Sequence, residues 1–258
     1  GNEREVGEAL EEAFSQGLVS RSDLWITGKL RNDDHAEDAV PRALAQTLRD
    51  LRIDYLDLYL VHWPFTGVEA PTLTPSMEET WRGMEAVRAS GKARSIGVCN
   101  LSAKKLAAMR AHARVMPAVN QVEVHPLFRQ DRLLRACAAL GVHVTAFSPL
   151  GSPDSARLFR RRGPRLLDHP VVQAVARERG MDRGQVLISW ALDRGTSVIP
   201  KSVTPKRISS NLESILQHHT TTHTAMLSSI PHQKRLIGGE FCVQGGGPYR
   251  SVEELWDE

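Results

Sequence analysis

Short stretches of strand-forming residues alternate with helical patterns along this chain, and this alternation restricts the fold more than any other feature. Residues 55–61 are rich in aromatic and branched side chains, as a buried strand requires. Ser76 and Glu79 have the spacing of a helix capping box, and apolar residues follow them at helical intervals. Parallel strands need crossover connections, which helices supply. The alternation therefore predicts an α/β protein with a parallel sheet.

Six strands and eight helices fit the pattern. The predicted strands cover residues 24–27, 55–61, 94–98, 118–122 and 142–147, with a sixth at 198. The predicted helices cover residues 1–17, 35–51, 76–87, 102–113, 129–140, 169–179 and 182–193, with an eighth that opens at 205. This count favours a (β/α) barrel over an open sheet, although periodicity alone does not decide between them. A chain of 258 residues suits one such barrel or two smaller domains.

Composition excludes several classes of function. The hydrophobic fraction of 41% and the charged fraction of 24% are ordinary for a globular protein, and no apolar run is long enough for a membrane span. A net charge of +3 argues against a nucleic-acid partner, and the arginines between 157 and 165 lack an aromatic platform. Three unevenly spaced cysteines favour a reducing compartment, so we expect a cytoplasmic protein. Because the sequence starts at Gly1, organellar targeting stays open.

The stretch from Val198 to Arg207 reads as a strand, a basic loop and a helix start. Thr204 suits an N-cap, and a proline follows it at the first helical position. A helix N-terminus attracts anions, and Lys201 and Arg207 add full positive charges beside it. Physical chemistry alone predicts a phosphate clamp, and the alternative is a solvated basic loop.

Polar residues also stand where predicted strands end. In a βα barrel, these positions face the active site. Taken singly, each could be an ordinary rim residue, and a lone histidine more often is one. Six of them at six strand ends favour a site. They are Lys29, His62, Asn100, Gln121, Ser148 and Lys201.

Four segments of this sequence resemble the signature motifs of the aldo-keto reductases, of the aldehyde- and aldose-reductase type. They are Ile199-Pro200-Lys201-Ser202 with Arg207, residues 59–64 (Tyr-Leu-Val-His-Trp-Pro), residues 97–100 (Gly-Val-Cys-Asn) and residues 148–154 (Ser-Pro-Leu-Gly-Ser-Pro-Asp). They occur in the family's order and spacing, so the resemblance covers nearly the whole chain. It implies a (β/α)8 TIM barrel that binds NADPH/NADP+ and acts on a small-molecule carbonyl substrate as a monomer.

The resemblance implies a role for each matching residue. His62 resembles the histidine that orients the substrate carbonyl, Lys29 resembles the lysine that lowers the pKa of a proton-donating tyrosine, and Trp63 lines either the substrate pocket or the core. The matches to cofactor-binding positions comprise two groups. Cys99, Asn100, Gln121 and Phe147 would surround the nicotinamide, whereas Ser148, Leu150, Ser152, Lys201, Ser202, Thr204, Arg207 and Asn211 would hold the phosphates and adenosine.

Two departures from the family pattern stand out. The family's first two strands, its first helix and its catalytic aspartate and tyrosine have no match, so the resemblance implies one incomplete barrel domain over residues 1–258 with little reductase turnover. The alternatives are a barrel that binds NADPH without catalysis, as a sensor or partner scaffold, and a defective gene-model product. The other departure is a His/Thr-rich tract at 216–226, where we expect no amphipathic helix and where metal binding is the less favoured option. Residues 227–258 form the predicted C-terminal tail.

Overall fold

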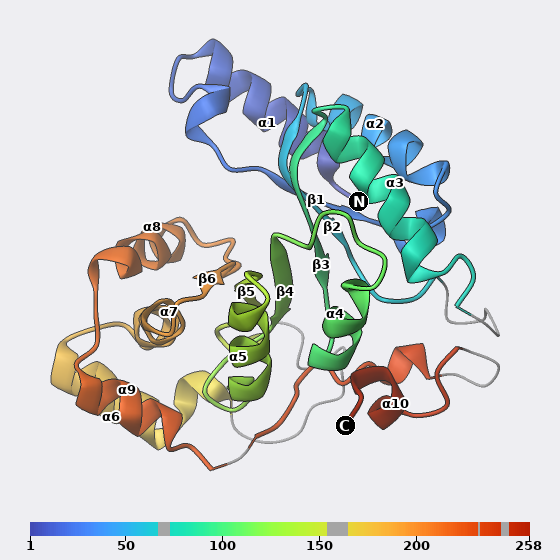
Figure 1. Cartoon of the computed structure of the whole chain (residues 1–258). Coiled ribbons are helices and arrows are strands. Elements are labelled where there is room, and N and C mark those ends of the chain that lie inside the picture. The colour runs from blue at the N-terminus through green and yellow to red at the C-terminus, as the bar shows by residue number, and fades with distance from the viewer. Residues whose placement is uncertain (67–72, 154–164, 232, 244–247) are drawn as a thin grey trace. The chain divides into compact units, whose positions relative to one another are not determined.

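The computed structural model describes all residues except 67–72, 154–164, 232 and 244–247 (Figure 1). Its strands follow chain order in a six-stranded sheet, and the pairs β1–β2, β2–β3 and β5–β6 are parallel. This confirms the predicted α/β class. The strands are β1 (Thr27–Leu30), β2 (Leu56–Val61), β3 (Ala93–Cys99), β4 (Val119–Glu123), β5 (His143–Phe147) and β6 (Ser197–Val198). None of the helices in the described part of the chain is long and apolar enough to span a membrane.

The chain divides into two compact units. Unit 1 comprises Gly1–Asn120, Leu140–Val142 and Gly239–Glu258, and unit 2 comprises Gln121–Ala139 and His143–Gly238, so that the boundary falls within β4. The helices of unit 1 are α1 (Glu3–Ser15), α2 (Ala39–Leu51), α3 (Met77–Ala89), α4 (Ala103–Met109) and α10 (Val252–Trp256). Those of unit 2 are α5 (Asp131–Ala139), α6 (Pro170–Arg179), α7 (Arg183–Asp193), α8 (Pro205–Glu213) and α9 (Thr221–Ser228).

In unit 1, strands β1 to β3 bury one face against helices and the other in an apolar cluster. Along α2 and α3, the apolar residues at helical spacing are buried, including Leu44, Trp81 and Met84, and Figure 1 shows the two helices side by side. As predicted, Ser76 caps α3 and accepts a hydrogen bond from the backbone N–H of Glu79. The opposite face of β2 buries Leu58 and Leu60 with residues of β3 and β4.

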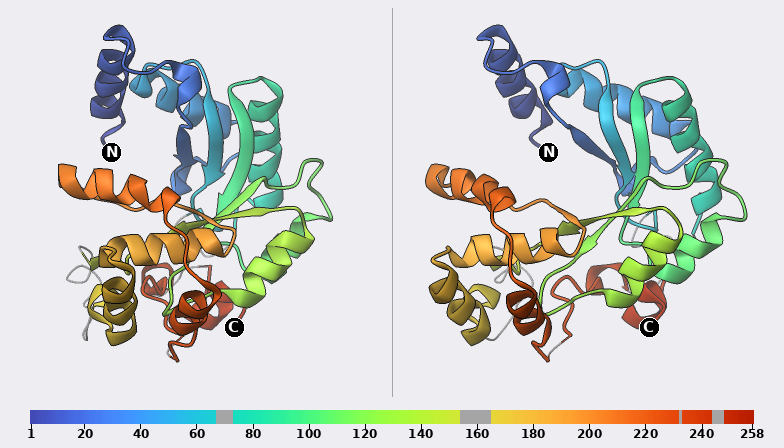
Figure 2. Two further views of the ribbon diagram at one scale, coloured as in Figure 1. Left: turned by 90° about the vertical axis from the view of Figure 1, so that its left-hand side faces the viewer. Right: turned by 60° about the vertical axis from the view of Figure 1, so that its left-hand side comes forward.

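In unit 2, α7 is the central helix. All seven residues from Gln185 to Ala191 are buried, and the helix contacts α6, α8, α9 and β6 (Figure 2). A helix that is apolar on most sides is typical of a packed interior. Strand β6 joins β5 through the pairs Thr145–Ser197 and Ala146–Val198. The basic loop that follows β6 is therefore anchored at its first residues.

Two predictions were wrong in detail. The first strand begins at Thr27 rather than at 24, so Lys29 lies inside β1 instead of beyond its end. In the His/Thr-rich tract, where we expected no amphipathic helix because its helix propensity is weak, the short helix α9 forms from Thr221 to Ser228. Thr220 caps it through the backbone N–H of His223, while His223 and Leu227 are buried on it. A good cap and two buried side chains outweigh weak intrinsic propensity. No group of three metal-binding side chains occurs in the described residues.

Candidate functional site

In unit 1, Lys29, His62 and Cys99 occupy neighbouring strands on or beside one face of the sheet. The register pairs Lys29 with Leu60, whose side chain joins Cys99 in the apolar cluster. His62 follows β2 directly, and its backbone N–H donates to the carbonyl of Leu30 at 3.3 Å. Parallel pairing puts paired side chains on the same face. Lys29 and Leu60 therefore point to the same face of the sheet, and His62 follows two residues after Leu60.

The charge of Lys29 acts on both neighbours. Burial, and after it the Lys29 charge, lower the pKa of His62, although part of the residue remains exposed. A lowered pKa keeps the imidazole neutral at neutral pH. Burial raises the pKa of the Cys99 thiol to about 12, against the opposing effect of Lys29. Cys99 is therefore a protonated, buried thiol. Across the described residues, Lys29 itself forms no ion pair.

Asn100 holds its amide in a fixed direction. Its backbone has a φ of 60°, and its Nδ2 donates to the carbonyl of His62 at 3.0 Å. Asparagine tolerates this left-handed conformation better than most residues. The side chain is buried, and its Oδ1 accepts no hydrogen bond from any described residue. A buried acceptor without a donor is costly, so this oxygen fits a ligand that presents an N–H.

Trp63 belongs to an aromatic cluster. Its ring lies 6.3 Å from that of His62 and 5.1 Å from that of Phe241, measured between centroids. Only 7% of Trp63 is exposed. Trp63 therefore packs in a core and adjoins His62, and its role at the substrate pocket stays a prediction.

In unit 2, Gln121 lies on the face of β4 opposite to Asn120, because side chains alternate along a strand. Both residues are buried, and Asn120 uses its amide to bind the backbone of Leu101. Phe147 ends β5 and is half-buried. Phe147 is the last residue of β5, but Gln121 lies at the centre of β4 rather than at its end, so its predicted place at a strand end was wrong.

Ser148 and Ser152 close a tight loop after β5. Their hydroxyls bond each other, and the N–H of Gly151 donates to the carbonyl of Ser148 at 2.8 Å. Gly151 has a φ of 75°, and a Cβ there would lie 2.9 Å from Leu166. The loop thus depends on a glycine at its centre. Asp154 of the predicted motif lies outside the described residues, as do the arginines from 157 to 162.

Lys201, Ser202 and Asn211 line a cavity of 630 Å³ together with apolar residues of β6 and α8. Leu150 and Asn211 both adjoin Gly184, which brings the loop after β5 close to this cavity. Thr204 and Arg207 do not line it. Thr204 occupies the N-cap of α8 as predicted, but its side chain makes no capping hydrogen bond. Ser202 Oγ instead accepts from the N–H of Thr204 at 3.1 Å.

Sequence reasoning missed a buried pair that follows Gln121. Glu123 accepts a hydrogen bond from His125, with 2.7 Å between Oε1 and Nε2. It also accepts from the backbone N–H groups of Leu236 and Ile237, at 2.7 and 2.9 Å. The alternation of polar residues at 121, 123 and 125 along a buried strand was the available signal, because charged side chains in such a strand need partners.

Comparison with known proteins agrees with this geometry. The family model for the Aldo/keto reductase family matches residues 1–230. An aldo/keto reductase of Synechocystis is 42% identical over 100% of this chain and 82% of its own length. A member of aldo-keto reductase family 4 from Arabidopsis thaliana is 38% identical, with the same two coverages.

Solved structures give the same answer. The crystal structure of a Bombyx mori aldo-keto reductase in complex with NADP superposes on this chain with a TM-score of 0.85 at 35% sequence identity. The match covers 96% of this chain and 81% of the Bombyx mori chain. A second aldo-keto reductase, complexed with NADPH, gives a TM-score of 0.86 at 32% identity, with coverages of 96% and 76%. The chain belongs to the aldo/keto reductase family.

Proposed function

We propose that this chain binds NADPH and that its site reduces the carbonyl group of an aldehyde or ketone to an alcohol. The carrying observation is the buried Oδ1 of Asn100, which lacks a donor among the described residues. The carboxamide of a nicotinamide offers the N–H2 group that this oxygen requires. The relatives in complex with NADP and NADPH support the same choice of ligand.

Around the substrate, unit 1 supplies the polar groups. His62, neutral because of burial and the Lys29 charge, would donate a hydrogen bond to the carbonyl oxygen. Lys29 would favour the negative charge that develops on that oxygen. Trp63, beside His62, would contact the apolar part of the substrate. When bound, the nicotinamide supplies the hydride.

The other positions that match the family's cofactor-binding residues belong to unit 2. Gln121 and Phe147 would contact the nicotinamide, and the loop containing Ser148, Leu150 and Ser152 would cover the pyrophosphate. The adenosine and its 2′-phosphate would bind at the cavity beside β6 and the start of α8. Lys201, Ser202 and Asn211 would supply contacts from the lining of the cavity, and Thr204 and Arg207 would supply contacts from the start of α8 beside it.

The 258 residues on their own would turn over slowly. Proton transfer to the product needs a positioned acid, whose loss typically costs roughly 10²–10⁴-fold in rate. None of the three tyrosines lies beside Lys29. Tyr59 is paired with Gly28 on the helix-covered face of β2, Tyr55 stacks against Arg21 and Arg94, and Tyr249 bonds the carbonyl of Pro64. This observation favours the second candidate function, an NADPH-binding barrel with little catalysis.

One experiment tests the cofactor assignment. NADPH and NADH are titrated into the wild-type chain, into the double variant Lys201→Ala/Arg207→Ala and into Asn100→Gly, with binding followed by fluorescence. The double variant should weaken NADPH binding alone, because only NADPH carries the 2′-phosphate. Asn100→Gly should weaken both cofactors, by about tenfold for one lost hydrogen bond. Equal losses for the two cofactors in the double variant would remove the phosphate assignment.

A parallel assay with 4-nitrobenzaldehyde measures turnover. Little turnover with intact NADPH binding would favour the non-catalytic alternative. Fast turnover would mean that another residue of the chain supplies the proton.

A further inference from the structure

Trp63 and four other aromatic side chains of unit 1 form a cluster, which we call the Trp63 cluster. The other four members are Phe65, Phe241, Tyr249 and Trp256. Ring centroids lie 5.8 Å from Trp63 to Phe65, 5.1 Å to Phe241 and 6.0 Å to Trp256, and Phe65 meets Tyr249 at 6.3 Å. Three of the five come from the last twenty residues of the chain. The surroundings of Trp63 are therefore built largely by the C-terminus of unit 1.

Exposure separates Phe241 from the rest of the cluster. It is 37% exposed, whereas the other four members are no more than 7% exposed. Its ring meets Trp63 edge-on, with an interplanar angle of 90°. Trp63 in turn adjoins His62. Trp63 thus adjoins both the C-terminal Phe241 and His62.

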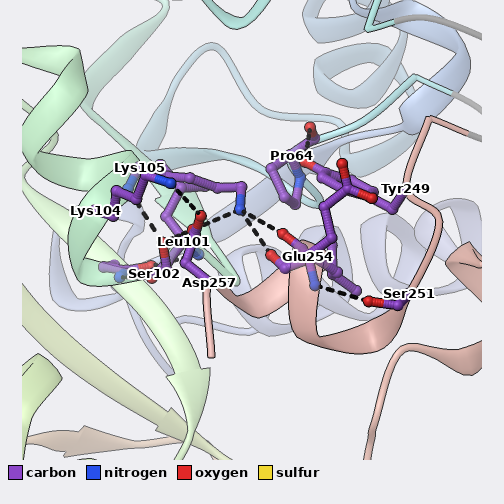
Figure 3. Close-up of polar contacts among 11 residues, drawn as sticks. Pro64, Leu101, Ser102, Lys104, Lys105, Tyr249, Ser251, Glu254 and Asp257 are labelled. Atoms are coloured by element: carbon purple, nitrogen blue, oxygen red, sulfur yellow. Dashed lines mark hydrogen bonds and ion pairs between the residues drawn. The ribbon is translucent and has the colours of Figure 1, made fainter.

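A single lysine of α4 gathers the polar groups of this C-terminus (Figure 3). Lys105 Nζ donates to the carbonyl of Leu255 at 2.8 Å and to that of Glu254 at 3.4 Å. It also bonds the Asp257 carboxylate at 2.6 Å and lies 5.3 Å from the centre of the Tyr249 ring. The last carbonyls of a helix lack partners within the helix, and a cation there satisfies them.

Asp257 completes the contact from the other side. It follows α10 with a φ of 58°, and its carboxylate also accepts a hydrogen bond from Ser102, the N-cap of α4. Burial alone would raise the pKa of Asp257, but hydrogen bonds from Lys105 and Ser102, with the Lys105 charge, outweigh it and lower the pKa. The carboxylate is therefore ionised, and its bond to Lys105 is charge-assisted.

The end of α10 is connected to Phe241 through Gly239. A Cβ on Gly239 would lie 2.5 Å from Leu255 and 3.4 Å from Trp256, so the backbone there packs directly on α10. Gly239 also has a φ of 90° and precedes the short helical turn Glu240–Cys242 that carries Phe241. The turn that carries Phe241 therefore begins at a residue that packs directly on the end of α10.

We propose that Lys105 is a positioning residue, which fixes α10 and through it the Trp63 cluster that borders the carbonyl-binding site. Lys105 contacts neither His62 nor the cofactor-binding residues, and acts only through the C-terminal residues. The inference rests on the proposed function, since it takes Trp63 to contact the substrate.

The chain offers a matched control on the same helix. Lys104 pairs with the same carboxylate at 3.3 Å, but its side chain is 82% exposed, against 21% for Lys105. Solvent-exposed ion pairs contribute little to stability. Lys105→Ala should therefore loosen the C-terminus, Lys104→Ala should not, and Lys105→Arg should restore the wild-type behaviour because it keeps a cation at the helix end.

Two measurements on the full chain test the proposal. Hydrogen exchange of the amides of residues 252–257 should be about tenfold faster in Lys105→Ala than in Lys104→Ala, as expected for a lost charge-assisted bond. The dissociation constant of 4-nitrobenzaldehyde, measured by tryptophan fluorescence with NADP+ present, should rise about tenfold in Lys105→Ala. That of NADPH should stay within about twofold, since the cofactor residues are untouched.

Each other result overturns the proposal. Equal exchange in the two variants would mean that Lys105 does not hold α10. Faster exchange with unchanged aldehyde binding would make Lys105 merely structural, and equal losses of aldehyde and NADPH binding would indicate general disruption. If the wild-type chain binds no NADPH, the proposed function fails by itself, while the exchange comparison still decides whether Lys105 fixes the C-terminus.

Discussion

Glu123 and His125 form a buried pair at the end of β4, with 2.7 Å between Glu123 Oε1 and His125 Nε2 and no more than 1% of either side chain exposed. The same carboxylate accepts the backbone N–H groups of Leu236 and Ile237. Leu236 in turn reaches Gly151, in the loop after β5. Glu123 thus ties the strand that carries Gln121 to a segment 113 residues further along the chain.

Replacing this carboxylate should destabilise unit 2 strongly. Breaking a buried pair by removing one partner typically costs about 3–5 kcal/mol, because the remaining polar groups stay buried without partners. We expect a loss of this size in the free energy of unfolding for Glu123→Ala. Glu123→Gln should lose less, since one oxygen remains as an acceptor. Urea unfolding followed by circular dichroism measures both.

Glu178→Gln is the matched control. Glu178 pairs with His223 at 3.1 Å, but its side chain is 63% exposed, so its loss should change the free energy of unfolding by less than about 1 kcal/mol. If Glu123→Ala cost no more than this control, the buried pair would have no stabilising role.

The alternation of strands and helices could be predicted from sequence because local periodicity determines it. The cap at Ser76 and the buried stripe at Trp81 and Met84 need only residues a few positions apart. Boundaries were less predictable. Trp25 has high strand propensity, yet it is 67% exposed and lies outside β1, because pairing with β2 begins only at Thr27. Pairing partners lie far away in the sequence, and propensity does not report them.

In the candidate site, too, some features could be predicted from the sequence and others could not. Its residue types could be proposed from short motifs, but their places could be predicted only in part, because Lys29 and Gln121 lie within strands rather than at their ends. The unpaired Oδ1 of Asn100 could not be predicted from the sequence. It results from the left-handed backbone of Asn100 and from the hydrogen bond between its Nδ2 and the carbonyl of His62. Lys105 and Asp257 are 152 residues apart in the sequence, and the residues around each of them do not predict their contact.

Removing the Lys29 charge should raise the pKa of His62. Two effects lower this pKa, burial first and the Lys29 charge second, so Lys29→Met removes one and leaves the other. The pKa should move upward toward the ordinary value of histidine. Titration of the His62 ring by NMR, assigned with His62→Gln, measures the shift. Lys104→Met serves as the control, and a shift as large in that variant would show that Lys29 has no specific effect.

Substitution of His62 itself should separate substrate from cofactor. His62→Gln removes an imidazole N–H next to the proposed carbonyl site, so 4-nitrobenzaldehyde binding should weaken about tenfold. NADPH binding should change by less than about twofold. If NADPH affinity collapsed instead, His62 would belong to the cofactor site or the core.

Acid should destabilise unit 1 through His35. This residue is 2% exposed, its Nε2 has no partner among the described residues, and burial lowers its pKa to about 4 against a small opposing effect of Asp33. Between pH 6.5 and about 4, the unfolded chain binds a proton at His35 that the folded chain does not. Stability therefore falls as the pH falls through this range, by roughly 3 kcal/mol in total.

The test compares pH dependence rather than absolute stability. His35→Gln should flatten the fall in unfolding free energy between pH 6.5 and 4, whereas His218→Gln, at a side chain that is 74% exposed, should leave it unchanged. An unaltered pH dependence in His35→Gln would mean that other groups cause the acid sensitivity.

Two helical glycines should respond in opposite directions to alanine. In α1, a Cβ on Gly7 would lie 2.1 Å from the carbonyl oxygen of Asp50, so the backbones of α1 and α2 must separate. Overpacking of this kind typically costs about 1–3 kcal/mol. In α7, a Cβ on Gly184 would meet its nearest neighbours at 3.9 Å, an ordinary contact, so Gly184→Ala should gain about 0.5–1 kcal/mol from helix propensity.

Thermal unfolding of the two variants beside the wild type measures both effects. The midpoint should fall for Gly7→Ala and rise for Gly184→Ala. Because the two substitutions are chemically identical, propensity alone would raise both midpoints. A rise for Gly7→Ala would therefore show that α1 does not pack against Asp50 and Leu51 as closely as its backbone contact requires.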